Sequence, residues 1–209
     1  MQRRNFIKGG LLASSLSLKS SSSTLAPIEF IPISPEERKT RVAKAQKLMA
    51  EKQIQAIILD AGVNMNYFTG ISWYPSERSM LAVIPVKGEI NFICPAFEED
   101  RFLELAPAGT KVSIWEEDEN PFALTTCVLK GIGIEKGQIG IDEFCRFFIF
   151  DGLRKSDANF QFVSADPITI PCRIIKSPAE IALMQKANDA TVKAIQAGIA
   201  ALTMGCTPR

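Results

Sequence analysis

The side chains that could bind a metal ion through oxygen atoms are carboxylates, and they cluster in two runs. These runs are Glu98-Glu99-Asp100 and Glu116-Glu117-Asp118-Glu119. Carboxylates are suitable ligands for Ca²⁺ or Mg²⁺. However, adjacent acids on a helix point to different faces, and the second run lacks the glycine-punctuated spacing of a calcium loop. The sequence therefore favours solvated turns over metal sites at both runs.

The absence of histidine limits the chemistry further. The chain contains no histidine, the commonest general base and metal ligand. A Ser-His-Asp triad or a mixed histidine and carboxylate centre cannot be completed within these residues, and no G-x-S-x-G elbow occurs. Asp60 and Asp142 each end a predicted strand, but no base, nucleophile or glycine-rich phosphate loop accompanies them. We expect both to cap the elements that follow, and we predict no catalytic residue and no metal ligand in this chain.

A polar and aromatic loop offers a candidate binding surface. Trp73, Tyr74 and Arg78 precede a predicted strand, where they could wall a substrate cleft. Arginine suits a carboxylate because its planar fork presents paired donors. The alternative, which the sequence favours, is that the aromatic residues cover a sheet edge and Arg78 forms a surface ion pair.

The cysteines and the overall charge exclude other classes. The five cysteines form no C-x-x-C pair, so we expect small buried side chains rather than a disulfide or zinc framework; they are Cys94, Cys127, Cys145, Cys172 and Cys206. The chain is 46% hydrophobic, which is typical of a globular protein. Its 24 basic and 23 acidic residues give no electrostatic reason to bind nucleic acid or an anionic membrane.

The first residues have the layout of an export signal. A basic start with Arg3-Arg4, Phe6, Ile7 and Lys8 precedes a short apolar stretch and small residues up to Ala26. This start resembles the bacterial twin-arginine signal, which predicts export, most simply to the periplasm. The apolar stretch is too short to anchor the chain in a membrane. The alternative is an N-terminal tail that carries two arginines but is not an export signal, which would leave the protein in the cytoplasm. Residues 1–33 are predicted to be leader and linker.

Residues 34–170 alternate between helical and strand patterns. Ser34 and Glu37 form a predicted capping box that opens a helix reaching about Lys52. A β-hairpin turns at Lys87-Gly88-Glu89. The other predicted strands cover 56–59, 112–115, 139–142 and 160–163, and the other helices cover 96–106, 121–130 and 146–155. This alternation predicts a three-layer α/β/α domain on a mixed sheet.

Residues 171–209 predict a connector followed by one amphipathic helix. Pro167, Pro171 and Pro178 indicate an extended connector from 167 to 178. Ser177 and Glu180 form a second capping box, and Gly205 is expected to end the helix. Its apolar stripe requires a partner surface and consists of Ile181, Met184, Val192, Ile195, Ile199 and Leu202. We therefore expect this helix to be the first element of an incomplete second domain.

From about residue 34 to the end, the order of several short strings resembles the creatinase, prolidase and Xaa-Pro aminopeptidase family of metallopeptidases. No single string is diagnostic, but their order and spacing are fairly specific. The strings are Asn66-Tyr67-Phe68-Thr69-Gly70, the strand from Arg78 to Pro85, Lys87-Gly88-Glu89, Pro95-Ala96-Phe97-Glu98, Gly140-Ile141-Asp142, and Arg173 to Ile181 with Met184, Lys186 and Ala187.

The resemblance implies a fold and a function. It implies an N-terminal domain with a ribonuclease H-like motif, followed by a "pita-bread" catalytic domain. In the family two divalent metal ions (Mn, Co or Zn) are held there by two Asp, two Glu and one His. None of these ligands has a counterpart in this chain, which is therefore expected to be inactive alone.

The implied role is that of a non-catalytic domain of an exported Xaa-Pro aminopeptidase or dipeptidase, acting on short proline-containing peptides. The domain would wall the substrate cleft and support a homodimer or higher oligomer. The alternative is a free-standing binding or scaffold module of the same fold.

Overall fold

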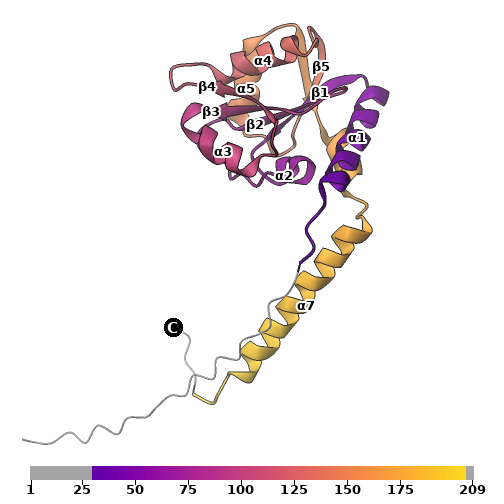
Figure 1. Ribbon diagram of the computed structural model, residues 1–209, viewed down its shortest axis with the longest axis vertical. Coiled ribbons are helices and arrows are strands. Elements are labelled where there is room, and N and C mark those ends of the chain that lie inside the picture. Colours follow the sequence, from indigo (N-terminus) through magenta and orange to yellow (C-terminus); the bar gives the residue numbers. More distant parts are fainter. Residues whose placement is uncertain (1–29, 206–209) are drawn as a thin grey trace, which may run out of the picture.

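The computed structural model describes residues 30–205, and a mixed six-stranded sheet forms their centre (Figure 1). The strands are ordered β4-β3-β2-β1-β5-β6. Strand β2 runs antiparallel to β1 and β3, and the remaining neighbours are parallel, which confirms the predicted hairpin and mixed sheet. The strands are β1 (Ile54–Asp60), β2 (Leu81–Pro85), β3 (Asn91–Pro95), β4 (Lys111–Trp115), β5 (Gly137–Ile141) and β6 (Phe160–Ser164).

Helices cover both faces of this sheet and make the predicted three layers. Helices α1 (Pro35–Glu51), α2 (Val63–Thr69), α3 (Glu99–Leu105) and α6 (Asp166–Arg173) pack on one face. Helices α4 (Pro121–Gly131) and α5 (Phe147–Ser156) pack on the other. A short 3-10 turn, η1 (Ala96–Glu98), precedes α3, so the predicted helix over 96–106 is confirmed. Strand β1 is buried between the two layers, as its continuous apolar run predicts.

Helix α1 shows why the first predicted capping box is only half formed. The Ser34 hydroxyl accepts a hydrogen bond from the Glu37 amide at 3.1 Å, as expected of an N-cap. The Glu37 carboxylate instead accepts hydrogen bonds from Arg41 and Ser177. The reciprocal half of the box is therefore wrong, because stronger charged and tertiary partners occupy that carboxylate.

The predicted extended connector is also wrong over its first part. Residues Asp166–Arg173 form helix α6, whose Ile168, Thr169 and Cys172 are buried. Pro167 lies in the first turn, where proline fits, and Pro171 lies inside the helix. Burial of the apolar face outweighs the hydrogen bond that Pro171 cannot donate. The domain boundary predicted after residue 170 falls inside this helix.

Helix α7 (Pro178–Ala200) extends away from the domain (Figure 1). Its predicted capping box is confirmed: Ser177 Oγ accepts from the Glu180 amide at 3.2 Å, and Glu180 Oε2 accepts from the Ser177 amide at 2.8 Å. The helix ends at Ala200, so the predicted end at Gly205 is five residues too late. No helix within residues 30–205 is long and apolar enough to cross a membrane. The predicted leader and Cys206 lie outside the described residues.

Candidate functional site

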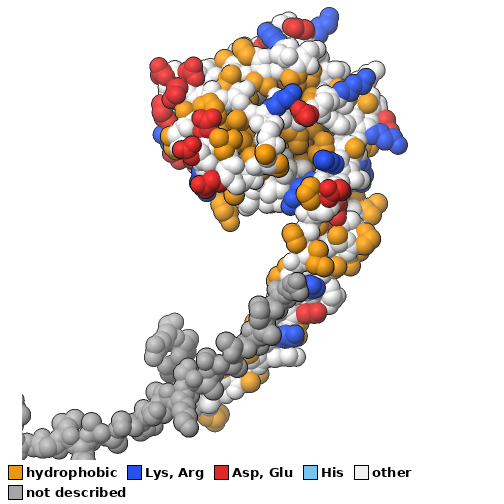
Figure 2. All heavy atoms as spheres, in the orientation of Figure 1, with side chains coloured by type: hydrophobic (Ala, Val, Ile, Leu, Met, Phe, Trp, Pro, Cys, Tyr) orange, Lys and Arg blue, Asp and Glu red, His pale blue; other side chains and the backbone are white. Residues whose placement is uncertain are grey.

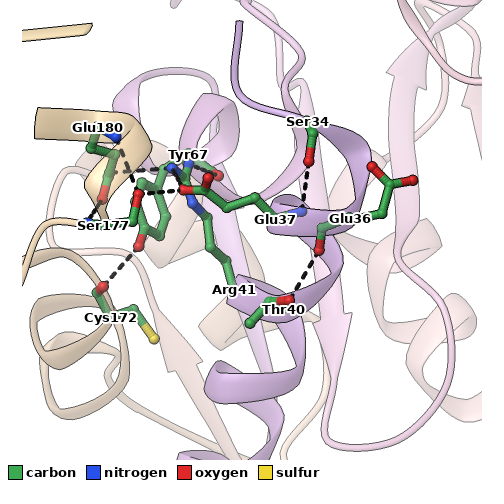
Figure 3. Close-up of polar contacts among 9 residues, drawn as sticks. All are labelled: Ser34, Glu36, Glu37, Thr40, Arg41, Tyr67, Cys172, Ser177 and Glu180. Carbon is green, nitrogen blue, oxygen red and sulfur yellow. Dashed lines mark hydrogen bonds and ion pairs between the residues drawn. The ribbon is translucent and has the colours of Figure 1, made fainter. Parts of the chain in front are cut away.

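The candidate site lies where α7 joins the domain, and Arg41 of α1 is its centre (Figure 3). Arg41 Nη2 lies 2.7 Å from Glu37 Oε1 and 3.2 Å from Glu180 Oε1, so one guanidinium joins α1 to α7. Arg41 Nη1 donates to the Tyr67 carbonyl at 3.0 Å. Because Arg41 is only 8% exposed, these contacts are shielded from solvent and stronger than surface ion pairs.

Two further contacts close this junction. Ser177 Oγ donates to Glu37 Oε1 at 2.8 Å while also capping α7. Tyr67 Oη donates to the Cys172 carbonyl at 2.7 Å, which ties α2 to α6. Burial acts to raise the pKa of Glu37, but hydrogen bonds from Ser177 and Arg41 outweigh it and lower that pKa. We call Glu37, Arg41, Tyr67, Ser177 and Glu180 the α7 junction. It fixes the direction in which α7 leaves the domain.

A hollow of about 730 Å³ opens beside the α7 junction. Its walls come from α1, α2, the loop over 72–75 and the first turns of α7. Trp73 and Tyr74 line it, together with Phe144 and Met184. Most of these side chains are apolar, so the hollow suits an apolar or aromatic surface more than a free ion.

The three predicted binding residues do not share one environment: Trp73 and Tyr74 line the hollow, whereas Arg78 does not. Trp73 is buried and packs edge-on against Phe102, with the guanidinium of Arg101 4.6 Å from its ring centroid. Tyr74 is 80% exposed. Arg78 does not line the hollow: its Nε donates to Glu117 Oε1 at 2.6 Å and its Nη2 to Glu117 Oε2 at 3.0 Å. Arg78 therefore forms the surface ion pair of the favoured interpretation, and its hydrogen bonds lower the pKa of Glu117.

The strand-ending aspartates hold buried polar contacts. Asp60 Oδ2 lies 2.8 Å from Arg146 Nε, and Asp60 Oδ1 accepts from the Ala61 amide at 2.7 Å. Asp142 Oδ1 accepts from Asn64 Nδ2 at 2.7 Å and from the Phe144 amide at 3.1 Å. Both bind amides of the loops that follow, although neither caps a helix.

The two neighbouring carboxyl groups at the end of β5 differ in pKa. Burial raises the pKa of Asp142 to about 6. Burial acts in the same direction on Glu143, but hydrogen bonds from its backbone, Asn64 and Thr169 outweigh it, so its pKa is lowered. Through their hydrogen bonds these two carboxyl groups link β5, α2 and α6. Their role is to hold these elements together.

The acidic runs and the cysteines behave as structural or surface residues. Glu98 pairs with Arg101, and Glu119 accepts the Glu116 amide within its turn. No group of three or more Asp, Glu, Cys or His side chains in residues 30–205 is placed to hold a metal ion. The donor set of a two-metal centre is therefore not met by the described residues.

Cys94 and Cys172 are buried as expected and Cys145 is partly buried, whereas Cys127 is exposed, so that prediction is wrong for Cys127.

Two features of the site were not found by sequence reasoning. Arg41 and Tyr67 are 26 residues apart in the sequence and belong to different helices, and no local pattern links them. Glu37 gave a misleading signal, because its position three residues after Ser34 indicated a local cap. The Asn66 to Gly70 string did mark the segment that contains Tyr67.

Comparison with known proteins gives one consistent family. The sequence profile of the creatinase/prolidase N-terminal domain matches residues 41–175. An uncharacterized peptidase of Schizosaccharomyces pombe is 33% identical over 195 residues, covering 87% of this chain and 42% of the relative. An uncharacterized peptidase of Staphylococcus aureus is 25% identical over 170 residues, covering 81% of this chain and 46% of the relative. The chain thus spans less than half the length of these curated relatives.

Solved structures share the fold. A dipeptidase from Pyrococcus horikoshii superposes with a TM-score of 0.69 at 24% identity, covering 79% of this chain and 45% of that one. A prolidase from Thermococcus sibiricus gives a TM-score of 0.70 at 23% identity, covering 80% and 45%. The N-terminal domain of a Xaa-Pro dipeptidase from Lactobacillus brevis gives 0.57 at 18% identity, covering 65% of this chain and 99% of that one. The profile match covers most of the chain and the neighbours have the same α/β fold. This chain belongs to the creatinase/prolidase N-terminal domain family.

Proposed function

We propose that this chain is the non-catalytic N-terminal domain of a Xaa-Pro peptidase, and that it positions a catalytic domain through α7. One observation carries this proposal: α7 is anchored at its first turn, and the rest of the helix is exposed to solvent. The α7 junction fixes the first turn, whereas α7 has no buried residue. Figure 2 shows hydrophobic side chains exposed along this helix.

The exposed stripe of α7 suits a protein surface rather than water. Ile195 is 57% exposed and Ile199 is 64% exposed, and both lie on the predicted apolar face. A contiguous exposed apolar face of this kind is typical of an interface. We propose that the catalytic domain covers it. That domain would contain the two divalent metal ions (Mn, Co or Zn) and would act on short proline-containing peptides.

The hollow beside α7 supports a role in walling the substrate cleft. Tyr74 and Phe144 line it from different loops, and both side chains are largely exposed. Aromatic side chains supply large contact areas at interfaces. We propose that this edge faces the cleft or a neighbouring subunit in a homodimer or higher oligomer. Export through the twin-arginine-like leader is a separate proposal, and it rests on the first residues alone.

Hydrolysis assays test the proposed role. The chain alone, incubated with a Xaa-Pro dipeptide and Mn²⁺, Co²⁺ or Zn²⁺, is expected to give no turnover. A chimera that joins residues 1–209 to the part of the S. pombe relative beyond the aligned region is expected to hydrolyse the dipeptide. Metal-dependent turnover by the chain alone would overturn the proposal.

The alternative function is a free-standing binding module of the same fold, and the unpartnered hollow is the observation that favours it. The coding sequence after codon 209 separates the two. A frame that continues into Asp, Glu and His ligands supports the domain interpretation, whereas a stop codon supports the module.

A further inference from the structure

A second concave surface lies away from the α7 junction. It is a groove of about 650 Å³ between α1, the end of α2, the β2–β3 turn and the loop before β4. Its apolar floor includes Phe68, Ile71 and Phe92. Three basic side chains also line it: Arg38, Lys39 and Lys111. We call this surface the basic groove, and its role does not depend on the proposed function.

Arg38 is seated in the groove by the glycine that ends α2. Gly70 has a φ of 81° and caps α2 in the left-handed conformation. A Cβ on Gly70 would lie 2.5 Å from both Cζ and Nε of Arg38, so any other residue at this position would displace the guanidinium. The glycine of the Asn66 to Gly70 string therefore serves two purposes: it ends α2, and it lets the Arg38 guanidinium lie against the backbone.

The Arg38 guanidinium has no anion of its own. It makes no hydrogen bond or ion pair with any side chain or carbonyl among residues 30–205, although it is partly buried. Its charge helps to lower the pKa of the neighbouring Glu37, but that carboxylate is bound to Arg41 and Ser177. A planar fork of N–H donors is thus presented beside an apolar floor, a combination that fits a carboxylate.

The other charged side chains of the groove also carry more positive than negative charge. Lys39 is exposed and makes no ion pair among the described residues. Lys111 Nζ lies 3.3 Å from Glu89 Oε2, and Glu89 is the acidic residue that lines the groove. Three cations against one carboxylate leave an excess positive charge, which is complementary to an anionic ligand.

We propose that the basic groove binds the C-terminal residue of a peptide, with its carboxylate on Arg38 and an apolar side chain on the floor. A C-terminal residue carries its carboxylate and its side chain on one Cα. This arrangement matches a groove that Arg38 lines together with Phe68 and Ile71. A glutamate within a polypeptide carries its carboxylate at the end of its own side chain, with no second, apolar side chain on a neighbouring carbon. It therefore fits the groove less well.

Ligand pairs test the proposal on the unmodified chain. N-acetyl-leucine, N-acetyl-leucine amide and N-acetyl-glutamate α-amide would be titrated at millimolar concentrations while backbone amide chemical shifts are followed by NMR. N-acetyl-leucine is expected to bind at least tenfold more tightly than the other two, with shifts at Gly70 and Gly88. Equal affinity for acid and amide, or no binding by any of the three, would overturn the proposal. Equal affinity for the glutamate probe would overturn the assignment to a peptide terminus.

Variants locate the contact. Arg38→Gln is expected to lower the affinity for N-acetyl-leucine at least tenfold, and Arg38→Lys is expected to restore only part of it. Lys47→Gln is the matched control, because Lys47 is exposed on α1 and does not line the groove. Amide spectra of the free variants establish that each is folded. Unchanged binding by Arg38→Gln, or an equal loss in Lys47→Gln, would contradict the assignment.

Discussion

The guanidinium of Arg41 lies over the ring of Tyr67, with Cζ 4.1 Å from the ring centroid, and the same group donates to the Tyr67 carbonyl. This contact places a cation on the π face of an aromatic ring, and the same cation also pairs with the carboxylates of Glu37 and Glu180. Tyr67 in turn reaches the Cys172 carbonyl. Through these two residues, the position of α7 depends on α1, α2 and α6 together.

Replacing Arg41 should loosen the start of α7. In Arg41→Ala, the partly buried carboxylates of Glu37 and Glu180 lose their shared cation, so we expect the free energy of unfolding to fall by about 2–3 kcal/mol. Urea denaturation measures this loss, and amide hydrogen exchange should show faster exchange in the first turn of α7. Lys47→Ala, an exposed change on the same helix, is the control. A loss within about 0.5 kcal/mol for Arg41→Ala would contradict the structure.

The Tyr67 hydroxyl should contribute separately from its ring. Tyr67→Phe keeps the aromatic face under Arg41 but removes the 2.7 Å hydrogen bond to Cys172. We expect a loss of about 1 kcal/mol in the free energy of unfolding. Tyr74→Phe makes the same chemical change at a side chain that is 80% exposed and should leave stability unchanged. Equal effects of the two substitutions in thermal or urea unfolding would show that the bond to Cys172 is not made.

Arg146 should stabilise the buried side chain of Asp60. Asp60 is 2% exposed, and Arg146 binds it with Nε and Nη2, each at 2.8 Å. Arg146→Ala leaves a buried carboxylate without a cation, so we expect a loss of about 3 kcal/mol or more. Arg154→Ala breaks an exposed pair with Asp151 and should cost less than about 0.5 kcal/mol. Comparable urea midpoints for the two variants would contradict this assignment.

Asp142 should make stability depend on pH. Its pKa in the folded protein is raised from 3.8 to about 6, so the folded state binds this proton more tightly than the unfolded state. The stability that this group contributes is therefore present below about pH 4 and is lost as the pH rises through about 6. Asp142→Asn keeps an oxygen acceptor for Asn64 and removes the titration. We expect the variant to gain stability relative to the wild type between pH 4 and 7, by up to about 3 kcal/mol.

The difference between the two proteins, measured by urea denaturation at several pH values, reports the titration of Asp142 together with its effect on Glu143. Burial acts to raise the pKa of Glu143, and the hydrogen bonds that lower it include one with Asp142, so the substitution also changes the opposite contribution of Glu143. A difference that stays constant from pH 4 to 7 would show that Asp142 does not titrate in this range.

The strands could be predicted from the sequence because burial on both faces requires continuous apolar runs. Residues 56–59 and the hairpin around Gly88 show this most clearly. Helix α2 could not be predicted: its seven residues include two asparagines, a valine and a threonine, which favour helices weakly. It forms because Met65 and Phe68 are buried in the core. The same competition between local preference and burial explains why two prolines in α6 indicated an extended segment.

The candidate site was predictable only where its contacts are local. Ser177 and Glu180 cap α7 from three residues apart, and the spacing alone predicts that pair. Glu37 and Ser177 are 140 residues apart, and their hydrogen bond depends on the whole fold. Arg78 illustrates the converse, since its partner Glu117 lies in the loop after β4 and occupies the donors that a substrate carboxylate would need.

Hydrogen exchange along α7 tests most directly whether this helix is an interface to a catalytic domain. The chain alone would be compared with the chimera that carries the downstream part of the S. pombe relative. We expect fast exchange of α7 beyond its first turns in the chain alone and strong protection in the chimera. Ile195→Asp combined with Ile199→Asp should abolish that protection, whereas Ala197→Asp, on the opposite face, should not. Equal exchange of α7 in the chain and in an active chimera would show that the catalytic domain does not cover this helix.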